Sequence, residues 1–189
     1  MKTTNIMIVG VGGQGTLLTS RILGGLALKK GYDLKLSEVH GMAQRGGSVV
    51  TFVRYGQKVY EPIVEVGHAD VLIAFERLEA MRYAHFLKTD GVMVINDWRI
   101  DPITVLSGAA EYPDGILEKL KETHTVYDID AMKIAKELAN PRVFNMIVLG
   151  CAATHMEFEK EDWYDVIEQT VPKKTIDINK RAFDMGYRD

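Results

Sequence analysis

The stretch Asn5-Ile6-Met7-Ile8-Val9-Gly10-Val11-Gly12-Gly13-Gln14-Gly15 decides the fold class of this 189-residue chain. Its first five residues form a short apolar run that ends at glycines, which predicts a buried β-strand. Residues 16–30 carry Leu and Ile at helical spacing, and Gly31 follows as a natural C-terminal cap. A strand that enters a helix through a glycine-rich turn is typical of α/β proteins.

The rest of the chain continues this alternation. We expect strands at 33–36 and 48–55, with residues 55–57 turning the chain into an antiparallel strand at 58–60. Further strands are expected at 70–74, 91–96 and 125–129, and helices at 76–86, 114–122, 131–138, 143–154, 161–170 and 174–185. The sequence therefore predicts an α/β fold with a Rossmann-like, mostly parallel sheet, flanking helices, an antiparallel hairpin addition and a helical C-terminal part. No repeat or linker divides residues 1–189, so we expect a single domain.

Composition limits the kind of protein this is. Apolar residues make up 47% and charged residues 26%, a globular balance. The single cysteine, Cys151, excludes any cluster held by several thiolates of this chain. The five histidines lack metal-ligand spacing, so we expect no metal site. No signal sequence or membrane-spanning run is present, so we expect a cytoplasmic protein without membrane contact.

Basic charge and glycine are concentrated in the first third of the chain. Residues 1–60 hold eight Lys and Arg and only two acidic residues, whereas the whole chain has a net charge of −3. Glycine and positive charge together suit an anionic ligand. Because the basic residues form no dense stripe, we expect no nucleic-acid partner.

The glycine turn satisfies G-x-G-x-x-G between a predicted strand and a predicted helix. In that context the free N–H groups of the helix N-terminus bind a diphosphate. The candidate cofactor-binding residues are Gly10, Gly12, Gly13, Gln14 and Gly15. A dinucleotide site also needs an acid after the second strand, and Glu38 lies roughly there. A stand-alone NAD(P)-dependent dehydrogenase and a tight turn without a ligand are the two alternatives.

A second motif runs Ser37-Glu38-Val39-His40-Gly41-Met42-Ala43-Gln44-Arg45-Gly46-Gly47-Ser48, and we place it at the same sheet edge. Arg45 brings its one guanidinium, which can hold a carboxylate or phosphate with two hydrogen bonds. His40 can orient a substrate or transfer a proton near neutral pH, and a structural histidine is an equal alternative. Glu38 can instead pair with Arg45 and shape the loop.

The segments V-G-V-G-G-Q-G (9–15) and S-E-V-H-G-M-A-Q-R-G-G-S-V (37–49) resemble the gamma-type domain of 2-oxoacid:ferredoxin oxidoreductases. The resemblance runs from 5 to 186 and includes Asn145-Met146, Leu149-Gly150, Pro172, Asn179 and Ala182-Phe183. Residues 38–42 favour the aryl-pyruvate branch, the small (beta) subunits of indolepyruvate ferredoxin oxidoreductases. Gamma subunits that act on pyruvate, 2-oxoisovalerate or 2-oxoglutarate are the alternative.

The resemblance implies oxidative decarboxylation of a 2-oxoacid with CoA, giving an acyl-CoA, CO₂ and reduced ferredoxin. It also implies a large alpha subunit that holds thiamine diphosphate, Mg and [4Fe-4S] clusters, because one cysteine cannot ligate a cluster. The G-D-G…N motif for the Mg-diphosphate is absent as well. We therefore expect a hetero-oligomer in which this chain holds no cofactor alone, is inactive alone, and completes the active site.

The resemblance further implies where the substrates lie. The residues expected near CoA or the 2-oxoacid are His40, Gln44, Arg45, Gly46, Gly47 and Ser48. Glu38 and His40 are the catalytic candidates. A non-catalytic interaction module, in which both loops only fill an interface, is a further alternative.

Overall fold

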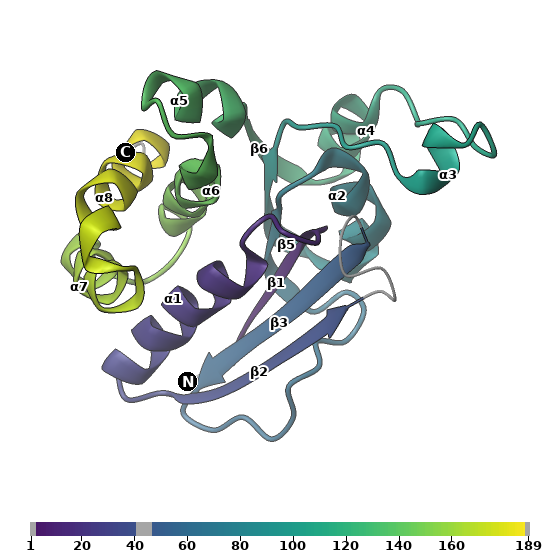
Figure 1. Cartoon of the computed structure of the whole chain (residues 1–189). Coiled ribbons are helices and arrows are strands. Elements are labelled where there is room, and N and C mark those ends of the chain that lie inside the picture. Colours follow the sequence, from purple (N-terminus) through teal and green to yellow (C-terminus); the bar gives the residue numbers. More distant parts are fainter. Residues whose placement is uncertain (1–2, 41–46, 188–189) are drawn as a thin grey trace.

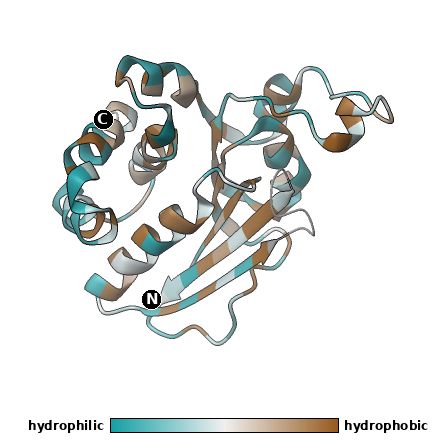
Figure 2. Ribbon diagram, in the orientation of Figure 1, coloured by the Kyte–Doolittle hydropathy of each residue, from teal (hydrophilic) through white to brown (hydrophobic). Residues whose placement is uncertain are grey.

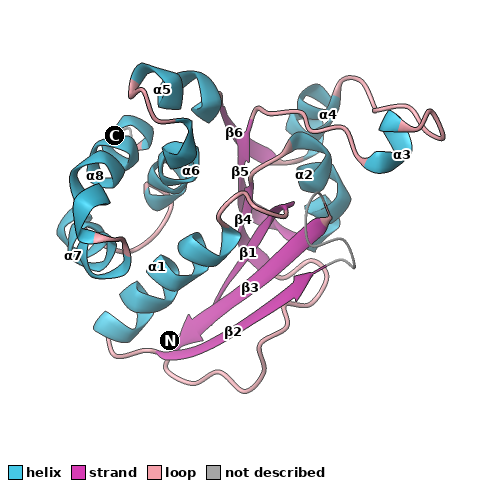
Figure 3. Ribbon diagram, viewed as in Figure 1, coloured by secondary structure: helices cyan, strands magenta, loops and turns pink. Residues whose placement is uncertain are grey.

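A computed structural model describes residues 3–40 and 47–187 of the chain, without the side chain of His40. In these residues six strands form one sheet, with helices on both of its faces (Figure 1 and Figure 3). The strands are β1 (Thr4–Val11), β2 (Asp33–His40), β3 (Ser48–Gly56), β4 (Ala69–Ala74), β5 (Leu87–Asn96) and β6 (Thr125–Ile129).

The helices are distributed unevenly along the chain. The α-helices are α1 (Thr16–Lys29), α2 (Arg77–Tyr83), α3 (Ile103–Leu106), α4 (Ile116–Thr123), α5 (Ala131–Glu137), α6 (Phe144–Ala153), α7 (Lys160–Thr170) and α8 (Ile176–Gly186). Short 3₁₀ turns lie at Ala84–Phe86, Pro141–Val143 and Lys173–Thr175. The four-residue helix α3 was not expected from the sequence. No helix within residues 3–40 or 47–187 is long and apolar enough to cross a membrane.

The strand order is β2-β3-β1-β4-β5-β6. Strands β1, β4, β5 and β6 run parallel, while β3 runs antiparallel to both β1 and β2. The mostly parallel sheet, its antiparallel hairpin and the helical C-terminal part are confirmed.

The hairpin is made by different residues from those expected. Residues 58–60 are not a strand, and the antiparallel partner of β3 is β2. The reason is that β3 pairs with β1 along one edge and with β2 along the other, so no edge is left for residues 58–60. That segment is held instead by the Val59 N–H, which donates to Asp33 Oδ2 at 3.0 Å.

The apolar side chains of β1 contribute to two hydrophobic cores, one on each face of the sheet. Ile6 and Ile8 pack with α1, α6, α7 and α8 on one face, and Met7 and Val9 pack with α2 and α4 on the other. Successive side chains of a strand point to opposite faces, so an unbroken apolar run is needed wherever both faces are covered. Figure 2 shows the strands largely brown and much of α7 and α8 teal.

The helical C-terminal part depends on one close crossing. A β-carbon at Gly150 would overlap the carbonyl oxygen of Phe183, and one at Gly186 would overlap that of Ile147. Helices α6 and α8 therefore touch backbone to backbone.

Candidate functional site

The glycine turn lies beside Gly47 and Ser48, the last residues of the second motif, at the carboxyl end of the parallel strands. Val11, the last residue of β1, is in register with Ser48, the first residue of β3. The Gly12 N–H donates to the carbonyl of Gly47 at 2.9 Å. Ligands of open α/β sheets bind at this edge. The structure therefore places the end of the second motif next to the glycine turn, at the same sheet edge, as the sequence predicted.

The glycine turn is held by the side chain of Gln14, which is buried. Gln14 Oε1 accepts from the Val11 N–H at 2.6 Å, and Gln14 Nε2 donates to the Phe75 carbonyl at 3.1 Å. A β-carbon at Gly10 would lie 2.7 Å from Gln14 Oε1. Glycine at position 10 thus leaves room for the Gln14 side chain, which is a structural reason for glycine there.

Helix α1 starts at Gly15, whose φ of 91° lies in the left-handed region that glycine tolerates. A β-carbon at this position would also overlap the amide nitrogen of Asn145 in α6. Gly15 has no side chain that could cap the helix, and no other side chain within residues 3–40 and 47–187 does so. The first N–H groups of α1 therefore face the same edge as the second motif, in the orientation that favours an anion.

The first part of the second motif is strand rather than loop. Residues 37–40 continue β2, since they pair with residues 49–52 of β3. Thr51 Oγ1 donates to Glu38 Oε2 at 3.0 Å across this pair of strands. Gln44, Arg45 and Gly46 lie outside the described residues, as does the side chain of His40.

The position of Glu38 disagrees with a dinucleotide site. Strand β3 lies between β2 and β1, so Glu38 is two strand spacings, about 10 Å, from the strand that carries the glycine turn. In dinucleotide-binding folds the strand with the acidic residue lies directly beside the first strand. The strand order therefore removes the geometry that a ribose contact by Glu38 needs.

A buried carboxylate supports the start of β3. Glu79 of α2 is 5% exposed, and its Oε2 accepts from Ser48 Oγ at 2.5 Å. Arg82 Nε lies 3.4 Å from the other oxygen, and the Tyr83 hydroxyl lies 3.3 Å from Ser48 Oγ. Burial raises the pKa of Glu79, against the opposing effects of the Ser48 hydrogen bond and Arg82.

A second carboxylate, Glu76, is 1% exposed and organises the next layer. Its Oε2 caps α2 by accepting from the Glu79 N–H at 2.9 Å. Its Oε1 accepts from the Ile100 N–H at 3.2 Å and from the Tyr112 hydroxyl at 2.5 Å. Burial, with the contact to Glu76 next in importance, raises the pKa of Tyr112. Glu76 thus fixes α2 and the segment after β5 to each other.

Sequence reasoning missed Glu76, Glu79 and Asn96. Asn96 is fully buried, donates to the Phe75 carbonyl at 3.2 Å and accepts from the Ala131 N–H at 3.1 Å. One signal was available: Glu76 follows β4 almost directly and Asn96 ends β5. Polar residues just after buried parallel strands meet at one edge of the sheet.

A small cavity of about 60 Å³ lies beside these groups. Its lining comprises Val11, Ser48, Glu76, Leu78, Glu79, Arg82, Ile100 and Pro102. This volume holds only a few water molecules, so the cavity as lined by the described residues does not enclose a nucleotide or an aryl side chain.

Within residues 3–40 and 47–187, no three His, Cys, Asp or Glu side chains are grouped to hold a metal ion. A four-thiolate cluster needs more than the one cysteine of the sequence.

Two curated proteins place the chain among known sequences. The chain is 41% identical to the indolepyruvate oxidoreductase subunit IorB of Thermococcus kodakarensis, over 100% of this chain and 96% of that protein. It is 29% identical to the 2-oxoglutarate synthase subunit KorC of Methanocaldococcus jannaschii, over 96% of this chain and 91% of that protein.

A solved structure and a family model complete the comparison. The gamma subunit of a keto/oxoacid ferredoxin oxidoreductase from Geobacter sulfurreducens has the same fold, with a TM-score of 0.71 at 23% identity over 97% of this chain and 96% of that one. Residues 5–188 match the family described as pyruvate ferredoxin/flavodoxin oxidoreductase. The chain belongs to this oxidoreductase family, which confirms the resemblance inferred from its two motifs.

Proposed function

We propose that this chain is the small subunit of a thiamine-diphosphate-dependent indolepyruvate:ferredoxin oxidoreductase of the cytoplasm. The reaction converts an aryl pyruvate, CoA and oxidised ferredoxin into an aryl-acetyl-CoA, CO₂ and reduced ferredoxin. A large alpha subunit holds thiamine diphosphate, Mg and the [4Fe-4S] clusters. This chain completes the active site and the access of CoA.

The substrate class rests on sequence similarity. Identity to the indolepyruvate subunit is 41%, against 29% to the 2-oxoglutarate subunit, at nearly the same coverage. Residues 38–42 precede the Arg-Gly-Gly of the second motif and are those that favoured the aryl-pyruvate branch. We therefore place indolepyruvate ahead of pyruvate, 2-oxoisovalerate and 2-oxoglutarate.

One structural observation carries the role in completing a site. The glycine turn and the second motif adjoin through the hydrogen bond from the Gly12 N–H to Gly47, yet the cavity beside them is only about 60 Å³. Both motifs suit an anion, and the described residues enclose little volume beside them. These two observations support a site that is completed only when another chain covers this edge of the sheet. In the proposed complex Gly12, Gly13 and Gly15 face a CoA phosphate, while Arg45 and Ser48 bind an anionic group of CoA or the 2-oxoacid.

Reconstitution tests the proposal. The chain is purified alone and with the large subunit encoded beside it, and CoA-dependent reduction of ferredoxin is followed with indolepyruvate, pyruvate and 2-oxoglutarate. We expect activity only from the complex, with the highest kcat/KM for indolepyruvate. Activity of the chain alone contradicts the division of roles, and a preference for another 2-oxoacid contradicts the substrate.

A calorimetric titration of the chain with NAD and NADP completes the test. Tight binding of either nucleotide would support a stand-alone dehydrogenase instead, despite the position of Glu38. Unchanged kinetics of the complex after substitution of both motifs would instead identify a non-catalytic interaction module.

A further inference from the structure

The segment between β5 and α4 projects from the body of the molecule (Figure 1). Its outer part, residues 103–111, begins with α3 and is called the arm below. Ile103 is 77% exposed and Leu106 is 70% exposed, and α3 contributes no buried residue. Residues three apart on a helical turn share a face, so the two side chains form one apolar patch.

The first eight residues of the arm carry no charge. Residues 103–110 read I-T-V-L-S-G-A-A, in a chain of which 26% is charged. Figure 2 shows α3 as a brown patch at the outer end of the segment. Exposed apolar residues elsewhere include Leu28 of α1, and also Tyr60, Ile63 and Val66, which are spread along the irregular segment between β3 and β4 rather than along one helical turn. Contiguous apolar surface marks interaction sites, whereas single exposed apolar residues are ordinary.

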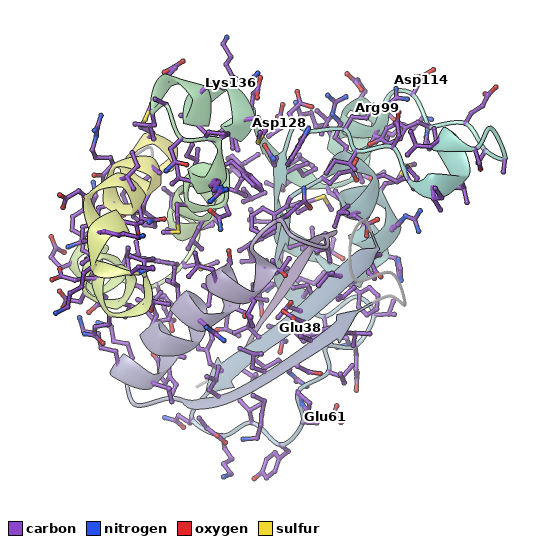
Figure 4. All side chains as sticks on the ribbon, in the orientation of Figure 1. Glu38, Glu61, Arg99, Asp114, Asp128 and Lys136 are labelled. Atoms are coloured by element: carbon purple, nitrogen blue, oxygen red, sulfur yellow. The ribbon has the colours of Figure 1, made fainter. Side chains whose placement is uncertain are left out.

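The base of the arm is firmly held. The Arg99 guanidinium lies 4.3 Å from the centre of the Tyr112 ring. The segment that leads into the arm therefore contacts the segment that leads out of it. Both segments also donate a hydrogen bond to Glu76, one from the Ile100 N–H and the other from the Tyr112 hydroxyl. Figure 4 shows Arg99 and Asp114 close to each other at this base. The buried carboxylate of Glu76 and the packing of Val105 against the core therefore fix the direction of a helix whose other apolar side chains, Ile103 and Leu106, are exposed.

The arm starts at the candidate site. Ile100 and Pro102, just before α3, line the same small cavity as Ser48 and Glu79. A chain that closes over this edge to complete the site therefore meets the arm as well. The acidic residues Glu111 and Asp114 are exposed where the chain returns from the arm to its base, so a matching surface is apolar with basic residues at its rim.

We propose that the arm docks into an apolar groove of the large subunit, with Ile103 and Leu106 as its anchors. This inference rests on the proposed function, because it takes the large subunit as the occupant. The continuity of the arm with the site edge, its uncharged first eight residues and the acidic residues where the chain returns from it favour this partner over a second copy of the chain, whose own arm is followed by the same acidic residues.

The test uses the double variant Ile103→Ser/Leu106→Ser in the full chain. The matched control is Leu28→Ser/Val66→Ser, which replaces side chains that are 62% and 60% exposed. Affinity for the purified large subunit is measured by calorimetry, and folding is verified by thermal unfolding. We expect the arm variant to weaken Kd about 100-fold, on the scale of losing two apolar anchors, and the control to leave Kd unchanged. The kcat at saturating small subunit stays at the wild-type value.

A second variant, Ala109→Glu, adds charge to the arm without removing an apolar side chain and is expected to weaken Kd in the same direction. Wild-type affinity in both arm variants overturns the inference and leaves the proposed function standing. Failure of the wild-type chain to bind the large subunit overturns both. A wild-type homodimer in sedimentation that the arm variant dissociates, with binding to the large subunit unchanged, identifies a second copy as the occupant and also overturns it.

Discussion

Ser48 donates a hydrogen bond to the buried carboxylate of Glu79 across 2.5 Å, and so ties the first residue of β3 to α2. The contact joins parts of the chain 31 positions apart. Ser48 also ends the second motif and pairs with Val11, at the start of the glycine turn. The placement of both motifs is thus coupled to one side chain of α2.

Replacing Ser48 with Ala removes this hydrogen bond. We expect the free energy of unfolding to fall by about 2 kcal/mol, the range for a hydrogen bond to a charged group, because Glu79 stays buried with one donor fewer. Urea denaturation of the isolated chain measures the change. The exposed Ser107 provides a control, since Ser107→Ala should alter stability by less than about 0.5 kcal/mol. Equal losses in the two variants would contradict a special role for Ser48.

Glu79→Gln should change how stability depends on pH. Burial raises the folded-state pKa of Glu79 above its ordinary value of 4.5, so just above that pH this side chain binds a proton more often in the folded than in the unfolded chain. The contribution of Glu79 to stability therefore falls as the pH rises from 4.5 through the raised pKa. The variant lacks this titration, so its stability relative to wild type increases over the same window. Denaturation between pH 4 and pH 8 checks this, and parallel pH profiles of the two proteins would contradict it.

Gln14→Ala should weaken the glycine turn. The substitution leaves the buried Val11 N–H without the partner it has at 2.6 Å, and an unsatisfied buried donor costs about 2 kcal/mol. Chemical denaturation measures the loss, with the exposed Gln57→Ala as the control. If Gln14 instead serves mainly to contact a ligand, the variant keeps wild-type stability and loses only affinity in the complex.

Local patterns in the sequence were enough to predict most elements of the fold. The apolar run at 5–9 predicted a buried strand, and β1 is that strand, with residues 6–9 fully buried. The partner of β3 was wrong because β-pairing depends on which edges are free, and that is a property of the whole sheet. The short turn at 55–57 looked like a hairpin, although both edges of β3 were already taken.

The site was predictable in its motifs and not in its support. The glycine turn and the second motif could each be recognised in the sequence, because the residues of each motif are only a few positions apart. The contacts of Gln14 with Phe75, and of Ser48 with Glu79, join residues that are 61 and 31 positions apart. Helix α3 escaped prediction because one turn without buried residues leaves no hydrophobic periodicity.

The last prediction concerns Arg45, which the sequence singles out as the one guanidinium of the second motif. In the complex, Arg45→Ala should raise the KM for CoA or for the 2-oxoacid by about 30-fold, equivalent to about 2 kcal/mol for a lost charged hydrogen bond. Arg45→Lys keeps the charge and loses the two-pronged geometry, so it should recover only part of the affinity. Arg181→Ala, on the exposed face of α8, controls for the loss of one positive charge.

Sedimentation of the same variants separates ligand binding from assembly. If Arg45 contacts a substrate, the complex of Arg45→Ala persists at the wild-type stoichiometry while one KM rises and the other stays. Dissociation of the complex, with wild-type KM values in the fraction that remains assembled, would show that the second motif serves assembly. That result would contradict the substrate role of Arg45, and it would leave the docking of the arm to be judged by its own variants.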